Sequence, residues 1–303
     1  MGQKDMVEKL LEDYEDVFAD IVNVLLFNGK RVISENSLKE TKLTSQYKAE
    51  TGKQHEQERD VAKYWTDGEV RIALCGIENQ TSEEKYMPSR VIGYDGASYR
   101  QQLLKINNGN KIVPVVTLVL YYGTSKWKAP CNLKGILDIN DNIKPFVNDY
   151  KANIYEIAFL DEKTVQKFTS DFKIVADFFV QKRKNNSYEP SKQKIAHVDE
   201  VMKFLKTLTG DSRYEVEFSK EEKERGVNMC NVIDKVEKQG IEKGIEKGIV
   251  QGIEIGKLEA YFDMFLDGEI TVEKAAKKTN LTEDAFLEKF KIWKSNNSTT
   301  RDN

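Results

Sequence analysis

Apolar and polar residues alternate along residues 59–80 in the manner of two β-strands joined by a turn. The first part ends in two neighbouring aromatic residues, and the second places apolar residues at alternate positions from Val70 to Leu74. Between them stands Asp67-Gly68, a dipeptide that strongly favours a tight turn between antiparallel strands. The pattern therefore predicts a β-hairpin.

Three polar residues lie near the end of the predicted hairpin that is far from its turn. Asp60 is on the first strand, and Glu78 and Gln80 are on the second. Because side chains alternate between the two faces of a strand, Glu78 and Gln80 share one face. Two carboxylates and an amide in this arrangement can hold a divalent cation and position a water molecule against a phosphodiester. The alternative is a surface hairpin whose carboxylates are simply solvated.

The register of this hairpin decides whether Asp60 and Glu78 can meet. If the two residues are directly opposed, the centre of the hairpin lies beyond Asp67-Gly68, and the offset is an odd number of residues. An odd offset would place Glu78 on the wrong face of an ideal two-residue hairpin. We therefore expect a three-residue loop with Gly68 in the left-handed region, together with strand divergence or a bend at Gly76.

Hydrophobic periodicity predicts helices and further strands on both sides of the hairpin. Apolar residues at three-to-four spacing predict a helix over residues 4–27 and another over 88–107. The β-branched run 112–122 predicts a strand that is buried on both faces, residues 154–160 predict another strand, and 162–184 predict a charged helix. This order of elements favours an α/β fold, with a mixed sheet flanked by helices.

The composition changes after residue 185, where a polar linker begins and a short amphipathic helix over 198–208 follows. Further along, glycines at a period of four would form one stripe on a helix, and isoleucines would form the next. Glycine disfavours a helix by about 1 kcal/mol at each interior position, so this segment is either an oligomerisation helix or a flexible charged linker. The glycine stripe consists of Gly240, Gly244, Gly248, Gly252 and Gly256, flanked by Ile241, Ile245, Ile249 and Ile253.

Two short helices are predicted near the C-terminal end. Thr271 and Thr282 are suitable N-caps for them, and a turn over 279–281 separates them. The spacing resembles a helix-turn-helix element, and a small capping pair of helices without DNA binding is the alternative. The sequence therefore predicts an α-helical C-terminal extension. The predicted regions are a core over 1–185, a helical linker region over 186–238, the glycine-stripe segment over 239–262 and the tail over 263–303.

Charge and composition limit the classes of function. The chain has 303 residues and a net charge of −3, so it is not globally basic as many nucleic-acid-binding domains are. Its three cysteines have no paired spacing and it has only two histidines, which argues against a zinc module, a disulfide scaffold and histidine-based catalysis. No apolar run is long enough to cross a membrane, and no apolar signal segment is present. We expect a cytoplasmic protein with no membrane span and no organic cofactor.

Four groups of residues follow one another in a defined order and spacing. They are Arg59-Asp60, Gly76-Ile77-Glu78-Asn79-Gln80-Thr81, Met87-Pro88-Ser89-Arg90 with Tyr94, and Val113-Pro114-Val115-Val116 running into Leu120-Tyr121-Tyr122-Gly123 and Trp127. Over residues 10–180 this set resembles the Rpn family of recombination-promoting nucleases and putative transposases, a branch of the PD-(D/E)XK nuclease superfamily. The glycine stripe is also a common ending in that family. Each group alone is weak evidence for the resemblance, whereas the ordered set is specific.

The resemblance implies a restriction-endonuclease-like core and metal-dependent endonucleolytic cleavage of DNA. It also implies Asp60 and Glu78 as ligands of Mg²⁺, with Ca²⁺ or Mn²⁺ as substitutes. Gln80 stands where the general superfamily motif has lysine, and a glutamine carries no positive charge and cannot act as a base. Its amide can still orient a water molecule, and Rpn-like sequences carry this glutamine themselves. We therefore expect activity that is slower or dependent on context.

Four further residues are candidates for supporting roles at such a site. Arg90 or Lys63 would stabilise developing negative charge on the phosphate, and for Arg90 an ion pair with a nearby acid is the alternative. Asp20 or Asn23 would approach the site from the first helix, and a solvated helix face is the alternative for these two.

Two other functions remain open beside the nuclease. One is a DNA-binding module with an inactive nuclease core, and the other is an oligomeric interaction protein in which the hairpin acids are structural. A nuclease that cuts both strands of a duplex benefits from two active sites. We therefore expect a homo-oligomer, most simply a homodimer, with the glycine stripe contributing to the contact.

Overall fold

The computed structural model of the chain divides into two compact units, Met1–Asp234 and Lys235–Asn303. The residues that the structure describes are 11–41, 44–48, 54–58, 60–68, 70–105 and 112–298.

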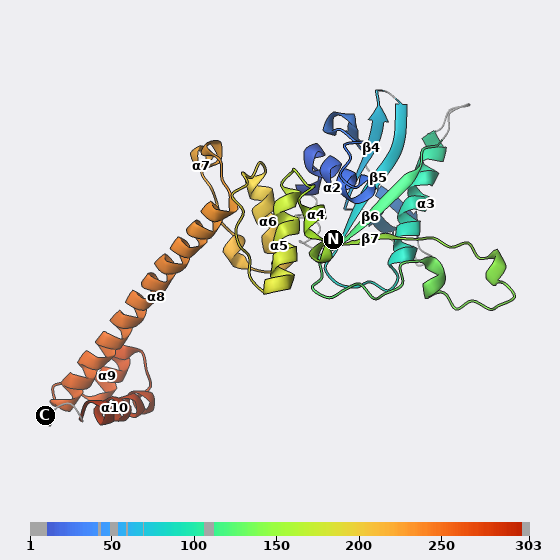
Figure 1. Cartoon of the computed structure of the whole chain (residues 1–303). Helices are drawn as coiled ribbons and strands as arrows, with labels where there is room; N and C mark the ends of the chain where they lie inside the picture. Colours follow the sequence, from blue (N-terminus) through green and yellow to red (C-terminus); the bar gives the residue numbers. More distant parts are fainter. Residues whose placement is uncertain are drawn as a thin grey trace. The chain divides into compact units, whose positions relative to one another are not determined.

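A five-stranded mixed sheet forms the centre of the first unit (Figure 1). Its strand order is β1-β4-β5-β6-β7, in which β1, β4 and β5 pair antiparallel and β5, β6 and β7 pair parallel. The mixed α/β fold predicted from the sequence is therefore confirmed. The strands are β1 (Leu38–Glu40), β4 (Val61–Asp67), β5 (Val70–Gln80), β6 (Val115–Tyr121) and β7 (Asn153–Glu156).

Helices cover both faces of this sheet. On one face, α3 (Met87–Lys105) packs Met87 and Val91 against Val119 of β6. On the other face lie α2 (Glu15–Phe27) and α5 (Phe172–Asn185), as Figure 1 shows. Among the described residues, the other helices that lie wholly within this unit are α4 (Glu162–Val165), α6 (Val198–Thr209), α7 (Lys220–Arg225) and the 3-10 helices η1 (Glu35–Ser37), η2 (Leu133–Ile136), η3 (Lys144–Phe146), η4 (Ile157–Phe159) and η5 (Ser212–Tyr214).

The predicted hairpin is the pair β4–β5. Val61 pairs with Ile77, so one further step along the ladder places Asp60 opposite Glu78. We predicted that a three-residue loop would bring Glu78 onto the same face of the sheet as Asp60, but the loop is not the cause. The register instead shifts between Trp65 and the residue after it, where β5 contributes one more residue than β4. Such a bulge restores the facing of every side chain beyond it.

Of the two hairpin glycines with a predicted role, Gly68 has the predicted conformation and Gly76 does not form the predicted bend. Gly68 has a φ of +59°, in the left-handed region that a tight turn requires. Gly76 pairs with Ala62 within the regular ladder, so the strand has no break there. The bulge already supplies the shift that a bend at Gly76 would have provided.

Several elements differ in extent from the sequence prediction. The strand predicted over 154–160 ends at Glu156 and continues as η4. The helix predicted over 162–184 is two helices, α4 and α5, with a turn between them. In the polar segment 30–57, where no element was predicted, the structure has β1 and a separate two-stranded sheet of β2 (Thr44–Lys48) and β3 (Gln54–Glu58). The first residues of the helix predicted over 4–27 lie outside the described residues.

The first compact unit continues to Asp234, past the core boundary at residue 185. The reason is the apolar face of α6, where Phe204 and its neighbours are buried. The Phe204 ring lies 5.6 Å from the ring of Tyr122, which directly follows β6. The segment after residue 185 therefore packs onto the sheet layer.

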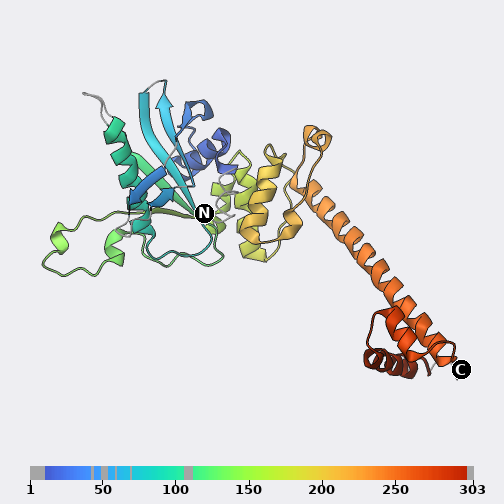
Figure 2. The same ribbon diagram turned by 180° about the vertical axis from the view of Figure 1, so that it is seen from behind.

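The second unit contains most of α8 (Met229–Leu266), followed by α9 (Val272–Thr279) and α10 (Glu283–Ser298). Thr271 caps α9 by accepting a hydrogen bond from the Lys274 amide, as predicted. A small aromatic core forms around Phe262, Ala275, Ala276 and Phe286. The glycine stripe lies within α8, which is one continuous helix (Figure 2). Among the described residues, no helix is long and apolar enough to span a membrane.

Candidate active site

Glu78 is the centre of a polar cluster at the C-terminal end of β5. Its Oε1 accepts hydrogen bonds from Nη2 of Arg90 (2.5 Å), Nε2 of Gln80 (3.1 Å) and the hydroxyl of Tyr94 (3.4 Å). Arg90 also donates to the Tyr94 hydroxyl at 2.9 Å, since the two residues are four apart on α3. The side chain of Glu78 is only 3% exposed, whereas that of Arg90 is 38% exposed.

The second carboxylate of the pair is Asp60, which directly precedes β4. Its Oδ2 accepts a hydrogen bond of 2.6 Å from the backbone amide of Asn79. The hairpin register places Asp60 beside Glu78, and the two carboxylates repel each other strongly enough to shift the protonation of Glu78. The structure thus brings together four of the residues predicted from the sequence: Asp60, Glu78, Gln80 and Arg90.

Electrostatics at Glu78 disfavour a bare negative charge. Burial and the charge of Asp60 raise the pKa of Glu78 to about 8, although Arg90 and the hydrogen bonds from Tyr94 and Gln80 oppose the shift. Burial, together with the charge of Glu78, raises the pKa of Tyr94 to about 12, so Tyr94 remains a hydrogen-bond donor. A cation between the two carboxylates would relieve their repulsion.

The carboxylate pair fits a hard divalent cation. Oε2 of Glu78 is buried and has no hydrogen-bond partner in the described part of the chain. A buried carboxylate oxygen without a partner is unusual, and a metal ion is one of the groups that satisfies it. The described residues hold no group of three or more His, Cys, Asp or Glu side chains placed for a metal. Mg²⁺ needs no such group, because it usually binds one or two carboxylates and completes its shell with water and substrate phosphate.

The structure corrects the prediction for Lys63. This residue is an odd number of positions from Asp60 along β4, so its side chain points to the opposite face of the sheet. There it is fully buried, and its Nζ contacts Glu15 at 3.0 Å and Asp13 at 3.6 Å. Lys63 joins the first helical segment to the sheet and does not face Glu78.

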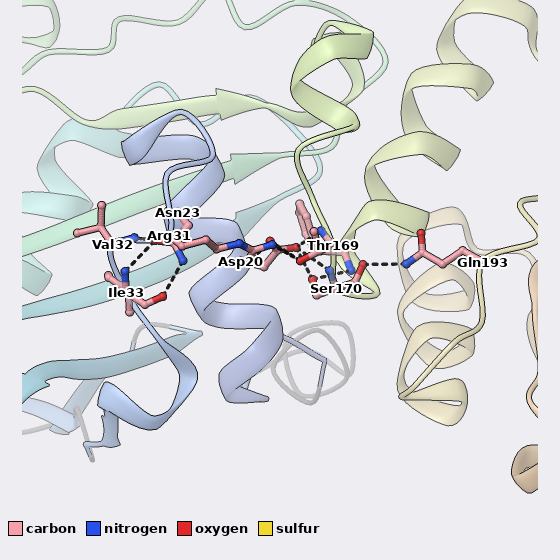
Figure 3. Close-up of polar contacts among 9 residues, drawn as sticks. Asp20, Asn23, Arg31, Val32, Ile33, Thr169, Ser170 and Gln193 are labelled. Atoms are coloured by element: carbon pink, nitrogen blue, oxygen red, sulfur yellow. Dashed lines mark hydrogen bonds and ion pairs between the residues drawn. The ribbon is translucent and has the colours of Figure 1, made fainter.

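Asp20 and Asn23 also have other partners, as Figure 3 shows. Both side chains are buried rather than solvated. Oδ2 of Asp20 accepts 2.8 Å hydrogen bonds from the backbone amides of Thr169 and Ser170 and from the Ser170 hydroxyl. Oδ1 forms an ion pair with Arg31 at 3.1 Å. This network holds the turn that separates α4 from α5, which explains why the predicted long helix is broken.

Asn23 organises the chain that follows the first helix, as Figure 3 shows. Its Oδ1 accepts hydrogen bonds from the amides of Val32 and Ile33, and its Nδ2 donates to the Ile33 carbonyl at 2.7 Å. These side-chain contacts all go to the loop after α2. The predicted approach of Asp20 and Asn23 to the site is therefore not seen.

Three residues of the site received no role from the sequence. Tyr94 could have been assigned one, because a position four residues after Arg90 on a helix faces the same way. Asn79 donates its backbone amide to Asp60, and its side chain contacts Glu12, which is 67 positions away in the sequence. No local pattern indicates a contact over that distance.

Comparison with known proteins gives one family. A family sequence model described as "Putative transposase, YhgA-like" matches residues 67–211, which include Glu78, Gln80, Arg90 and Tyr94. Neither the curated proteins nor the solved structures contain a match to this chain. Over residues 67–211, slightly less than half of the chain, the sequence is therefore similar to the YhgA-like putative transposases, which are part of the Rpn/PD-(D/E)XK nuclease family.

Proposed function

We propose that this protein is a metal-dependent DNA endonuclease that hydrolyses phosphodiester bonds and, like its family, promotes recombination. One observation carries the proposal. Glu78 is a buried carboxylate with one unsatisfied oxygen, and it stands beside a second carboxylate, Asp60. The family match over residues 67–211 supports a function of the nuclease or transposase kind, and the geometry supports the choice of residues.

Each residue of the cluster has a role in this proposal. Asp60 and Glu78 would hold Mg²⁺, which when bound neutralises the scissile phosphate and lowers the pKa of a water ligand. Gln80 would orient the attacking water through its amide, because it lies on the same face as Glu78. Arg90 is partly exposed and would stabilise negative charge on the phosphate. In the structure its guanidinium is paired with Glu78, which is the ion pair considered as an alternative from the sequence.

Plasmid cleavage tests this function. Purified protein incubated with supercoiled plasmid is expected to produce nicked and then linear DNA in the presence of Mg²⁺ or Mn²⁺, and no product in EDTA. The protein after EDTA treatment and addition of excess Mg²⁺ is the matched control, since cleavage should return. Cleavage that persists in EDTA, or none with either metal across a range of pH, would contradict the proposal.

The C-terminal helix pair supports the capping role more than DNA binding. In a helix-turn-helix protein, the first residues of the second helix enter the DNA groove. In α10 these residues include Glu283 and Asp284, whose charges repel phosphate. The apolar side chains of this pair pack on the end of α8 instead.

We also propose that α8 mediates homodimerisation. The four isoleucines beside the glycines are 53–63% exposed, although they form a continuous row. A methyl group added to any of the five glycines would meet no atom within 4 Å among the described residues. A second helix could therefore approach this face closely and bury the isoleucine row.

Alanine substitution in the glycine stripe distinguishes an α8 that packs against a partner helix from an α8 that has no partner. Replacing Gly244, Gly248 and Gly252 by alanine should stabilise an isolated α8 by about 1 kcal/mol per site, because alanine favours helices. If a partner helix packs on the stripe, the same change should weaken association of the full-length chain. Sedimentation equilibrium and thermal unfolding measure the two effects, with Lys243→Ala/Lys247→Ala as the control. An unchanged mass, together with a raised Tm, would contradict the dimer contact.

A further inference from the structure

Asn79 makes hydrogen bonds to two carboxylates, one at the candidate metal site and one behind the sheet. Its backbone amide donates to Oδ2 of Asp60 at 2.6 Å. Its side chain points to the opposite face, because Asn79 lies between Glu78 and Gln80 along β5. There Nδ2 donates to Oε2 of Glu12 at 2.6 Å, and the contact is buried. One residue therefore connects the metal-site carboxylate Asp60 to a carboxylate behind the sheet.

Glu12 is fully buried, and its two oxygens contact the ends of two neighbouring strands. Oε2 accepts from Asn79 of β5, and Oε1 accepts from the hydroxyl of Tyr122, just after β6, at 3.1 Å. The Tyr122 amide donates in turn to the carbonyl of Gln80 at 2.8 Å. Burying a carboxylate is unfavourable unless hydrogen bonds compensate it. Here the compensating donors lie directly behind the candidate site.

The Glu12 carboxylate explains the orientation of the Asn79 side-chain amide. Its Oδ1 is buried and has no hydrogen-bond partner in the described part of the chain. A flipped amide would place that oxygen against the Glu12 carboxylate, where the two acceptors would repel each other. Glu12 therefore fixes the amide although one polar atom stays unsatisfied. The side chain of Asn79 is thereby held by Glu12 on the residue whose backbone amide donates to Asp60.

We propose that Asn79 and Glu12 are positioning residues that hold Asp60 at the distance from Glu78 that a divalent cation requires. The inference rests on the proposed metal-dependent function. Asn79 acts through its backbone amide on Asp60, and Glu12 acts through the side chain of Asn79. Neither residue touches the cation. Residues that orient a metal ligand from behind typically change metal affinity by about 10–100-fold when they are replaced.

Calcium binding to the full-length protein without DNA tests this role, with isothermal titration calorimetry and thermal unfolding as the two readouts. Asn79→Ala removes the side-chain link and should raise the Kd for Ca²⁺ about 10-fold. The double variant Glu12→Gln/Asn79→Asp exchanges donor and acceptor, so the hydrogen bond can form again with reversed polarity and unchanged net charge. Its Kd should return to within about threefold of the wild-type value.

Thr66→Val is the matched control. It removes the hydrogen bond from the Thr66 hydroxyl to the Ser37 carbonyl, at the other end of the strand that Asp60 precedes. This variant should lower the Tm and leave the Kd for Ca²⁺ unchanged. A purely structural role of Asn79 would give the same pattern for Asn79→Ala, and that result would overturn the inference.

The two proposals fail in different ways. If the wild-type protein takes up no Ca²⁺ and no Mg²⁺, the metal site itself is wrong, and the positioning role falls with it. If the wild type binds Ca²⁺ and Asn79→Ala binds it equally well, only the positioning role is wrong. A double variant that stays as weak as Asn79→Ala, with a wild-type Tm, would also overturn the role of Glu12.

Discussion

Replacing Glu78 by glutamine is expected to abolish plasmid nicking while the fold remains intact. Glutamine has nearly the same shape, so the contacts with Tyr94 and Gln80 can be kept in part. It removes the charge that would hold the cation, and metal-ion catalysis supplies several kcal/mol, which corresponds to a loss of roughly a thousandfold or more. Nicking rate at saturating Mg²⁺ is the measurement. Gln80→Ala is the graded control, because it removes a water-orienting group and keeps both carboxylates.

The pH dependence of stability distinguishes this variant from one that is merely misfolded. The pKa of Glu78 is raised from 4.5 to about 8 by burial and by Asp60, so the native state binds this proton more tightly than the unfolded state does. The stability that this proton contributes is complete below pH 4.5 and is lost as pH rises towards 8. In metal-free buffer the wild-type free energy of unfolding should therefore fall across this range more than that of Glu78→Gln. Parallel curves for the two proteins, or wild-type nicking by the variant, would contradict the role of Glu78.

Replacing Asp20 by alanine should produce the largest loss of stability, about 2–4 kcal/mol. The change leaves the backbone amides of Thr169 and Ser170, whose bonds to Asp20 are partly buried, without their acceptor. It also removes the ion pair with Arg31, whose side chain is 53% exposed. Urea unfolding followed by circular dichroism measures the effect. We expect the nicking rate per folded molecule to remain that of the wild type.

Asp161→Ala provides the control for this prediction. Asp161 also accepts from a backbone amide, that of Thr164, but it is an exposed N-cap of α4. Its loss should reduce the free energy of unfolding by only about 1 kcal/mol. Equal losses for the two aspartates would contradict the buried network. A stable Asp20→Ala protein without nuclease activity would instead restore Asp20 to the active site.

The hairpin and its carboxylates could be predicted because the necessary information is local. The turn dipeptide fixes where the strands reverse, and the alternation of side chains places Glu78 and Gln80 on one face. The bulge near Trp65 was not predicted, because nothing in the residue types marks it. The same alternation would have placed Lys63 on the far face. The predicted role of Lys63 at the site was wrong because it rested on the positive charge of the side chain and ignored which face of the strand the residue occupies.

The remaining parts of the site depend on contacts that are distant in the sequence. Asp20 meets Thr169 across 149 positions, and Glu12 meets Asn79 across 67. An acid on an amphipathic helix looks solvated when only its own helix is considered. It becomes a buried acceptor when a later turn presents backbone amides to it. No local sequence pattern identifies the distant partner residue in such a pair.

Crystals of the metal-free protein soaked in Mn²⁺ test the carboxylate pair most directly. An anomalous difference map should show an ion in contact with both Asp60 and Glu78, and the same map from Glu78→Gln crystals should lack it. Oxygen ligands bind hard divalent cations at roughly 2.0–2.6 Å, so shared coordination is easily recognised. Well-ordered carboxylates with no ion between them, in crystals that bind Mn²⁺ elsewhere, would contradict a metal-dependent nuclease centred on Glu78.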